Sequence, residues 1–320
     1  MRRGKHLTIV GYHNITPTPI SKFSRNAGIR GFRQQVRTLR KIANVVPLHA
    51  AANALRDGGE LPPRAVAITF DDGYRDALDV AAPILVEYGM PATCFVVSGF
   101  ASGECEAWWE RLGWVVMTTA LPTLRFHGQA LALSGRSQRL AAVDTVLQHM
   151  KTLNRDQRER ELAEIVELLA PQGPPSSSRL FLDWDGCRAL VRHGFAIGSH
   201  SEVHTILARE DPAVQRQELA RSRETLEAEL DVSVDILAYP NGRRRDYSSA
   251  TIEAARSAGY SSALTTVHGR NDASTPPFEL RRVIVSPDLG PLGIMKALAQ
   301  IALAPWRRET GSDIAARAPL

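Results

Sequence analysis

Cysteine is scarce in this chain of 320 residues, with only Cys94, Cys105 and Cys187, and no two of them form a CxxC pair. An odd number without that spacing argues against a disulfide framework and against a structural zinc knot. We therefore expect free thiols and a reducing compartment.

Long apolar runs are also missing, because no run reaches the roughly 20 residues that a membrane-crossing helix needs. The N-terminal stretch KHLTIVGYHNI (5–15) has a short apolar run without a small-residue cleavage site, which indicates a strand and not a signal peptide. The segment PLGIMKALAQIALAPWRR (291–308) either lies at a membrane surface or packs on the domain as a C-terminal helix. We expect a cytoplasmic protein, with peripheral contact at the inner membrane face through this segment as a narrower hypothesis.

Acidic residues are outnumbered, 34 against 39 basic ones, and arginine clusters at 2–5, 243–245 and 306–308 account for much of the excess. Such clusters are either solvated faces or sites for an anionic partner, such as an acidic glycan, a phospholipid surface or a lipid pyrophosphate carrier. No basic helix with interleaved aromatic residues is present, which argues against nucleic acid. An apolar content of 44% can bury a large core.

Short β-branched runs alternate with helical segments along most of the chain. The spacing predicts strands at 7–12, 65–70, 93–98, 195–199, 235–239, 262–266 and 282–286. A helix ends at Gly89, and another begins with Asp211 as N-cap and Pro212 as its first residue. This alternation predicts a parallel sheet with helices outside it, either open or closed into a barrel.

Residues 101–180 break this rhythm and read as a helical insertion. They contain a hairpin pattern around RFHGQALAL, polar helices at 137–151 and 155–170, and the linker PQGPPSSSR. Trp108, Trp109 and Trp114 are interpreted as a small core for the insertion, with a sugar-stacking platform as the alternative.

The stretch AVAITFDDGYRD (65–76) runs from an apolar strand directly into Asp71 and Asp72. Buried adjacent carboxylates are costly unless positive charge compensates them, and both can face one site only where the backbone turns, as Gly73 permits. Helix capping is the plainer interpretation of this pair. The stretch GFAIGSHSEVHTIL (194–207) repeats the pattern, and His200 and His204, four residues apart, would share one side of a helical turn. Two imidazoles and one carboxylate form a three-ligand set of the kind that holds catalytic zinc.

TFDDG together with HSEVH resembles the polysaccharide deacetylase family, also called the NodB-homology or carbohydrate esterase family 4 fold. The resemblance covers residues 7–100 and 181–290 and implies a distorted (β/α) barrel that removes acetyl groups from N-acetylated sugars. It implies that Asp71 is the general base, and that the metal ligands are Asp72, His200 and His204.

The third family motif appears as LAYPNGRR (237–244), with Asn241 in place of an aromatic residue. The resemblance implies that the Asn241 backbone N–H helps to bind the oxyanion. The arginine that precedes the proline in the family is absent, so Arg281 or Arg282 is expected to take its place near the base or substrate, with a surface arginine as the alternative for each. Tyr239 either lines the sugar site or packs in the core.

The family places a general-acid histidine near the C-terminus, where His268 alone is available. LTIVGYHNI at the start of the chain instead resembles the permuted arrangement of the poly-N-acetylglucosamine deacetylases, which favours His13 as the general acid.

These observations predict one barrel domain over 1–290, interrupted by the insertion at 101–180, and a C-terminal segment and tail over 291–320. The expected activity is metal-dependent N-deacetylation, with Zn²⁺ favoured, of an N-acetylated glycan or of a lipid- or nucleotide-linked amino sugar, in exopolysaccharide biosynthesis. A metal-dependent hydrolase of cyclic amides or ureides and a non-catalytic carbohydrate-binding module are the alternatives.

Overall fold

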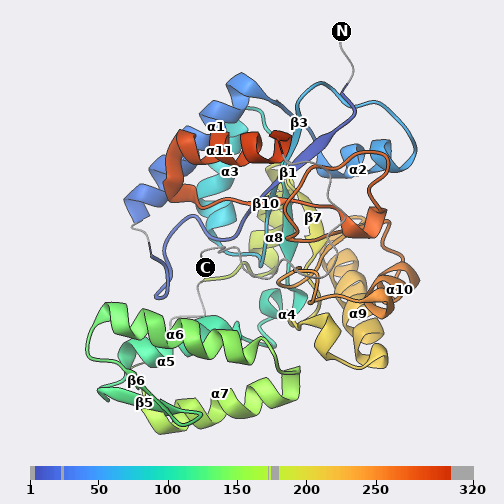
Figure 1. The fold of residues 1–320 in the computed structure, drawn as a ribbon. Helices are drawn as coiled ribbons and strands as arrows, with labels where there is room; N and C mark the ends of the chain where they lie inside the picture. The colour runs from blue at the N-terminus through green and yellow to red at the C-terminus, as the bar shows by residue number, and fades with distance from the viewer. Residues whose placement is uncertain (1–3, 23–24, 172, 174–179, 304–320) are drawn as a thin grey trace.

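The computed structural model describes residues 4–22, 25–171, 173 and 180–303, and a parallel sheet forms its centre (Figure 1). Within these residues the sheet has eight strands; seven follow the order β10-β1-β3-β4-β7-β8-β9, and β2 pairs with β3 off this path. The strands are β1 (Leu7–Tyr12), β2 (Asn44–Val45), β3 (Ala65–Phe70), β4 (Thr93–Val96), β7 (Ala196–Ser199), β8 (Ile236–Ala238), β9 (Ser262–Leu264) and β10 (Val283–Ile284).

Seven of these strands lie where the sequence predicts them, and β1 and β3 match to the residue. The later strands are shorter than predicted, because their C-terminal residues turn out of the sheet into loops. Strand β2 was missed, since two residues are too few to show a period-two pattern.

The sheet curls into an incomplete barrel whose two ends meet through Leu280. The Leu280 N–H donates to the Ala263 carbonyl of β9, and the Leu280 carbonyl accepts from the Thr265 N–H. Three residues later the chain enters β10, which pairs with β1 at the opposite end of the strand order. The distorted (β/α) barrel predicted from the sequence is confirmed.

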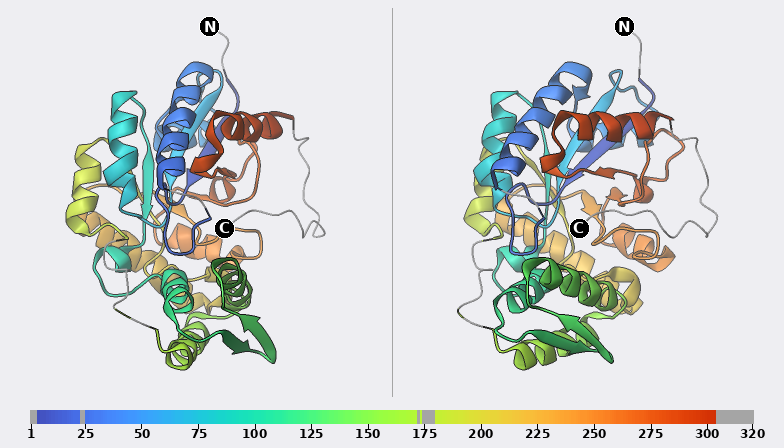
Figure 2. Two further views of the ribbon diagram at one scale, coloured as in Figure 1. Left: turned by 90° about the vertical axis from the view of Figure 1, so that its left-hand side faces the viewer. Right: turned by 60° about the vertical axis from the view of Figure 1, so that its left-hand side comes forward.

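Helices cover the outer face of the sheet, and Figure 2 shows α1, α3 and α8 side by side along it. The main apolar cluster lies between these helices and the sheet and includes Phe32, Phe70 and Phe195. The barrel helices are α1 (Arg25–Ile42), α2 (Leu48–Arg56), α3 (Ala82–Glu87), α4 (Ser98–Ala101), α8 (Trp184–Arg192), α9 (Pro212–Leu230), α10 (Ser249–Ser257) and α11 (Gly290–Leu303). Asp211 and Pro212 begin α9 as predicted.

The inner face of the sheet carries a smaller apolar cluster, in which Ile9, Phe95 and Ile236 pack with helix α2. Ala65 and Ala67 of β3 belong to this inner cluster, whereas Val66, Ile68 and Phe70 belong to the outer one. Because side chains alternate along a strand, residues 69 and 71 continue the inner face. The interior therefore changes from apolar to polar at the carboxyl end of β3.

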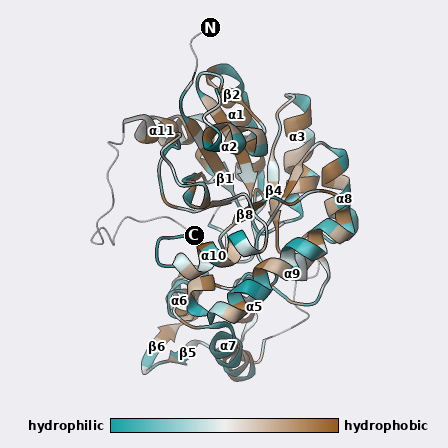
Figure 3. Cartoon of the chain, turned by 90° about the vertical axis from the view of Figure 1, so that its right-hand side faces the viewer, coloured by the Kyte–Doolittle hydropathy of each residue, from teal (hydrophilic) through white to brown (hydrophobic). Residues whose placement is uncertain are grey.

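The insertion folds around its own apolar cluster, which includes Trp108, Leu112, Val146 and Leu162. It comprises helices α5 (Trp108–Thr118), α6 (Arg136–Met150) and α7 (Arg155–Leu169) and the antiparallel hairpin of β5 (Thr123–Phe126) and β6 (Gln129–Ala132). Figure 3 shows these elements together below the barrel, with hydrophilic residues along the exposed side of α7. The predicted hairpin and both predicted helices are present.

Helix α11 packs on α1, and its residues Ile294 and Ile301 are buried in the main cluster, as expected for a C-terminal helix packed on the domain. The linker at 171–179 and the arginine clusters at 2–5 and 306–308 lie largely or wholly outside the described residues. Cys94, Cys105 and Cys187 are free thiols. Among the described helices, none has the length and apolar character that spanning a membrane requires.

Gly198 of β7 provides a test of the close packing beneath the site. A Cβ atom there would lie 2.4 Å from two ring carbons of Phe95 and 3.1 Å from the Ile236 carbonyl oxygen. We expect Gly198→Ala to lower the free energy of unfolding by about 1–3 kcal/mol through overpacking, measured by denaturant titration. Gly135→Ala is the control, because a Cβ atom added at Gly135 would have no neighbouring heavy atom within 4 Å. This variant should lower the free energy of unfolding by less than about 1 kcal/mol. Equal losses for both variants would show that the packing around Gly198 is not restrictive.

Candidate active site

The backbone turns sharply where β3 ends, and this turn brings two adjacent carboxylates into the barrel mouth. Asp72 has φ of 67° and Gly73 has φ of 73°, so both adopt the left-handed region. The Asp71 N–H still donates to the Tyr12 carbonyl at 2.8 Å, which holds Asp71 at the end of the strand. Both carboxylates are buried. The turn predicted at Gly73 is present, and it begins one residue earlier, at Asp72.

His200 and His204 do face one point, although not from a helical turn as the sequence predicted. Residues 200–204 form a loop after β7, with Ser201 at φ of 65° and His204 at φ of 54°. The loop is held by Glu218 of α9, whose carboxylate accepts from the N–H groups of Glu202 and Val203 at 3.2 Å each. Residues with positive φ reverse the chain direction, so spacing alone could not reveal this geometry.

Asp72, His200 and His204 form a three-ligand cluster at the barrel mouth. The Asp72 Oδ1 atom lies 3.2 Å from Nε2 of each histidine. Metal–ligand bonds of about 2.0–2.2 Å separate neighbouring ligand atoms by about 3.0–3.5 Å, so these distances suit a divalent transition metal. His200 Nδ1 donates to the Ala238 carbonyl at 2.7 Å, which orients the ring so that Nε2 faces Asp72 Oδ1.

Two further features show that the cluster fits a cation. Asp72 Oδ1 is a buried atom without a hydrogen-bond partner among the described residues. Burial lowers the pKa of His204 to about 4, so this ring is neutral and able to ligate at neutral pH. Burial opposes ionisation of Asp72, but the two imidazoles hold its pKa well below the usual range. A cation between the three groups would pair with the buried Asp72 oxygen that lacks a hydrogen-bond partner.

Asp71 is paired with Arg282, which resolves the choice left open by the sequence. Arg282 Nη1 donates to Asp71 Oδ1 at 2.7 Å, and Nη2 lies 2.6 Å from Oδ2. Burial would raise the pKa of Asp71, but the charges of Arg282, His200 and His13 keep it below the ordinary value. Arg281, one residue earlier, packs its side chain against Gly269 and does not reach the site.

Tyr239 does not line a sugar site, because its side chain is fully buried. Its ring stacks on Tyr247 at a centroid distance of 4.7 Å, and its hydroxyl donates to the Phe278 carbonyl at 3.1 Å. The alternative of core packing is therefore the correct one. Tyr239 is the residue after β8, and its side chain belongs to the main apolar cluster on the outer face of the sheet.

His13 lies on the open side of Asp71. Its Nε2 atom is 4.0 Å from Asp71 Oδ2, and its side chain is 40% exposed, whereas that of Asp71 is 1% exposed. His268 is exposed on the loop after β9 and has no contact with these groups among the described residues. Asn241 follows β8 at φ of 58°, and its backbone N–H makes no hydrogen bond within the described chain. The general-acid and oxyanion roles of His13 and Asn241 stay predictions.

The family model described as polysaccharide deacetylase matches residues 58–263. The chain belongs to the polysaccharide deacetylase family. YxkH of Bacillus subtilis, which carries a polysaccharide deacetylase name, is 25% identical over 226 residues, 71% of this chain and 53% of its own length. The family member described here thus spans about half the length of that curated relative.

Solved structures confirm the fold of this family member. The Streptococcus pyogenes deacetylase PplD has a TM-score of 0.61 at 19% identity, covering 91% of this chain and 97% of its own. IcaB from Ammonifex degensii has a TM-score of 0.57 at 19% identity, covering 92% and 98%. A de-N-acetylase from Aggregatibacter actinomycetemcomitans has a TM-score of 0.56 at 16% identity, covering 91% and 99%.

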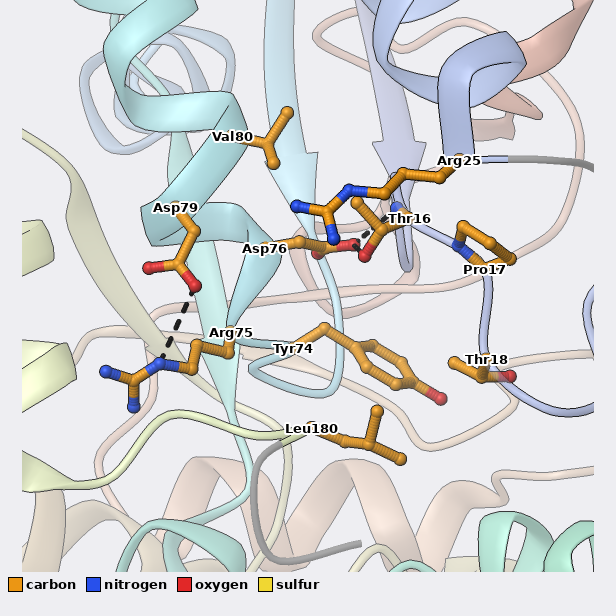
Figure 4. A pocket seen from close by; sticks show the side chains of 10 residues that line it. All are labelled: Thr16, Pro17, Thr18, Arg25, Tyr74, Arg75, Asp76, Asp79, Val80 and Leu180. Atoms are coloured by element: carbon orange, nitrogen blue, oxygen red, sulfur yellow. Dashed lines mark hydrogen bonds and ion pairs between the residues drawn. The ribbon is translucent and has the colours of Figure 1, made fainter. Parts of the chain in front are cut away.

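The sequence left Asp76 without a role, although it belongs to the same TFDDGYRD stretch. Its Oδ2 atom accepts from the Ile15 and Thr16 N–H groups at 2.7 and 2.6 Å and from the Thr16 hydroxyl at 2.9 Å. Figure 4 shows the Asp76 carboxylate directed at Thr16, in a pocket that none of the cluster residues lines. Asp76 thereby fixes the loop that carries His13.

The insertion reaches the cluster through Trp109. Its ring lies 4.4 Å from the His204 ring between centroids, and its indole N–H donates to the Tyr74 hydroxyl at 2.9 Å. That hydroxyl donates in turn to Glu110, a buried side chain whose pKa burial raises to about 7. The tryptophan pattern predicted a core for the insertion, and Trp108 and Trp109 do pack in that core. The contact between Trp109 and His204 could not be predicted from the sequence pattern.

Arg282→Met tests the charge balance at Asp71. Removing one partner of a buried ion pair leaves an uncompensated carboxylate, so we expect a loss of about 3–5 kcal/mol in unfolding free energy near pH 7. With Arg282 present the Asp71 pKa is lowered, so its stabilisation exists above the ordinary carboxyl pKa and is lost as the pH falls through the lowered value. Without Arg282, burial penalises the ionised form, so the deficit of the variant should begin to shrink as the pH falls toward about 4 and should continue to shrink below it.

Denaturant titrations at several pH values measure both effects. Arg281→Met is the matched control and should change stability by no more than about 0.5 kcal/mol at any pH. A deficit in Arg282→Met that does not depend on pH would show that lost packing, and not charge, determines it.

Proposed function

We propose that this family member is a metal-dependent hydrolase that removes N-acetyl groups from an amino-sugar glycan or glycan precursor. The observation that carries the proposal is the convergence of Asp72, His200 and His204 on one point, beside a buried Asp71–Arg282 pair that faces His13. A carbohydrate-binding module has no need for both a ligand set and a charged base beside it.

Asp72, His200 and His204 would hold the divalent cation, for which the two imidazoles and one carboxylate favour Zn²⁺. When bound, such a cation polarises an acetamide carbonyl and lowers the pKa of a water molecule. Three protein ligands would leave coordination positions for water or substrate.

Asp71 takes the proton of the attacking water. Arg282 fixes the carboxylate in one orientation through both of its terminal nitrogens, and each carboxylate oxygen retains a lone pair for a further contact. The pair is completely buried, so its orientation is set by packing and not by solvent. Asp71 remains ionised over the range in which a general base must accept a proton.

His13 and Asn241 act on the other atoms of the amide. His13 is partly exposed beside Asp71 and donates a proton to the departing sugar nitrogen. The unpaired Asn241 N–H, held at positive φ after β8, donates to the oxygen that gains negative charge during attack. Acetate and a free amino sugar are the products.

Support for a sugar amide comes from the family and from the relatives. The Streptococcus pyogenes deacetylase, similar in fold, was solved in complex with acetate, and another similar structure is a de-N-acetylase. A lipid-linked or nucleotide-linked precursor is the narrower form of the proposal, in which the exposed residues Leu289, Leu292 and Met295 near α11 would meet the membrane surface. Recovery of all the protein in the soluble fraction at low salt would contradict the membrane part.

Asp71→Asn and Asp72→Ala separate the base from the metal ligand. We expect Asp71→Asn to retain bound metal but to lose about 10²- to 10⁴-fold in turnover, because the amide cannot accept the proton. We expect Asp72→Ala to lose the metal of this site together with activity. Elemental analysis and mass spectrometry of N-acetylglucosamine oligomers, looking for loss of one acetyl group, measure both. Wild-type turnover in Asp71→Asn would contradict the assigned base.

His13→Ala tests the general acid against the alternative at His268. We expect His13→Ala to reduce turnover by about 10²-fold or more, because no other group among the described residues is placed to protonate the leaving nitrogen. His268→Ala is the matched control and should keep wild-type turnover. The reverse result, with activity retained in His13→Ala and lost in His268→Ala, would move the general acid to the C-terminal histidine.

A further inference from the structure

A second cluster of metal-ligating side chains lies in the insertion, separate from the barrel mouth. It consists of His127, His149 and Glu161, whose ligand atoms all lie within 4.8 Å of one another. The three come from different elements: the β5–β6 turn, the last turn of α6 and the middle of α7. Figure 1 shows this hairpin on the side of the insertion away from the sheet. Neither the family motifs nor the proposed chemistry uses these residues.

The geometry of the three side chains centres on one carboxylate oxygen. Glu161 Oε2 lies 2.9 Å from His149 Nε2 and 3.5 Å from His127 Nε2. These distances fall near the separations of about 3.0–3.5 Å expected between ligand atoms around one zinc ion. The two imidazole rings lie 4.3 Å apart between centroids. Each ring directs its Nε2 atom toward Glu161 Oε2.

The surroundings orient the two rings. Phe126 contacts both of them edge to face, at centroid distances of 4.5 Å to His127 and 5.3 Å to His149. His127 occupies the first position of a two-residue turn, at φ of 44°, followed by Gly128 at φ of 77°. Asparagine, aspartate and histidine are the residues other than glycine that most readily adopt this conformation, so the turn holds the His127 side chain in place without strain from a β-branched residue.

We propose that His127, His149 and Glu161 bind a divalent transition metal, Zn²⁺ in preference to Mg²⁺ or Ca²⁺, because two of the three ligands are imidazoles. The rings are partly exposed, which leaves a coordination position for water. The ion ties the hairpin to α6 and α7, three segments that are otherwise joined mainly through the apolar cluster of the insertion. This site is independent of the proposed deacetylation, and its role is to stabilise the insertion.

Metal counting in four proteins tests the proposal. Wild-type protein, Asp72→Ala, His127→Ala/His149→Ala and the triple combination are loaded with ZnSO₄, desalted and measured by elemental analysis. We expect about two, one, one and zero equivalents of zinc, respectively. The double variant His49→Ala/His193→Ala removes two exposed barrel histidines and should keep two equivalents. Unchanged zinc content in His127→Ala/His149→Ala would overturn the proposal.

Two readouts keep the test decisive if the double variant folds poorly. The Asp72→Ala protein keeps His127, His149 and Glu161, so saturating Zn²⁺ should still raise its Tm by about 3 °C, and Glu161→Gln in that background should abolish the rise. Co²⁺ in the Asp72→Ala protein should give the visible absorption of a four-coordinate ion. Absence of both the Tm shift and the Co²⁺ absorption in Asp72→Ala would also overturn the proposal, whatever the turnover of the wild-type enzyme.

Discussion

Two adjacent carboxylates buried at the end of one strand are the constraint on which the rest of the site depends. Neither Asp71 nor Asp72 can remain ionised away from water without positive charge nearby. The two aspartates have different partners, since Asp71 receives a guanidinium and Asp72 receives two imidazoles, with which it would hold the proposed cation. In the proposed mechanism one carboxylate is thereby kept free of the metal position, so the two neighbouring aspartates would take separate tasks.

The strand order explains how the compensating groups arrive. Strand β1 lies between β3 and β10, so the histidine that follows β1 and the arginine before β10 both flank the end of β3. Leu280 joins β9 to the chain entering β10, and Arg282 Nε donates to the Thr265 carbonyl at 2.8 Å on the same route. Closure of the barrel and orientation of Asp71 are therefore parts of one hydrogen-bonded connection. A sheet left open at this point would lose both.

Much of this fold could be predicted from the sequence, because β3 is a continuous apolar run that ends in a charged pair. The position of His13 could also be predicted, because β1 is likewise an apolar run and His13 is the residue that follows it. What could not be predicted depends on backbone turns and on packing between distant segments. His200 and His204 converge through residues at positive φ, and Tyr239 is buried by a contact with Tyr247 that no local pattern encodes. Arg281 and Arg282 are adjacent and chemically identical, so only their strand register separates them.

The insertion contributes more than bulk to the barrel mouth. Trp109 covers His204, and its indole N–H is held by Tyr74, which directly follows the turn after the two aspartates. A chain of hydrogen bonds from Trp109 through the Tyr74 hydroxyl to Glu110 therefore joins the aspartate turn to the insertion. Any movement of α5 relative to the barrel must break these contacts or displace the His204 ring. Helix α5 carries Trp109 and is also anchored by the apolar cluster of the insertion. The stability of the insertion and the position of the His204 ring are therefore coupled.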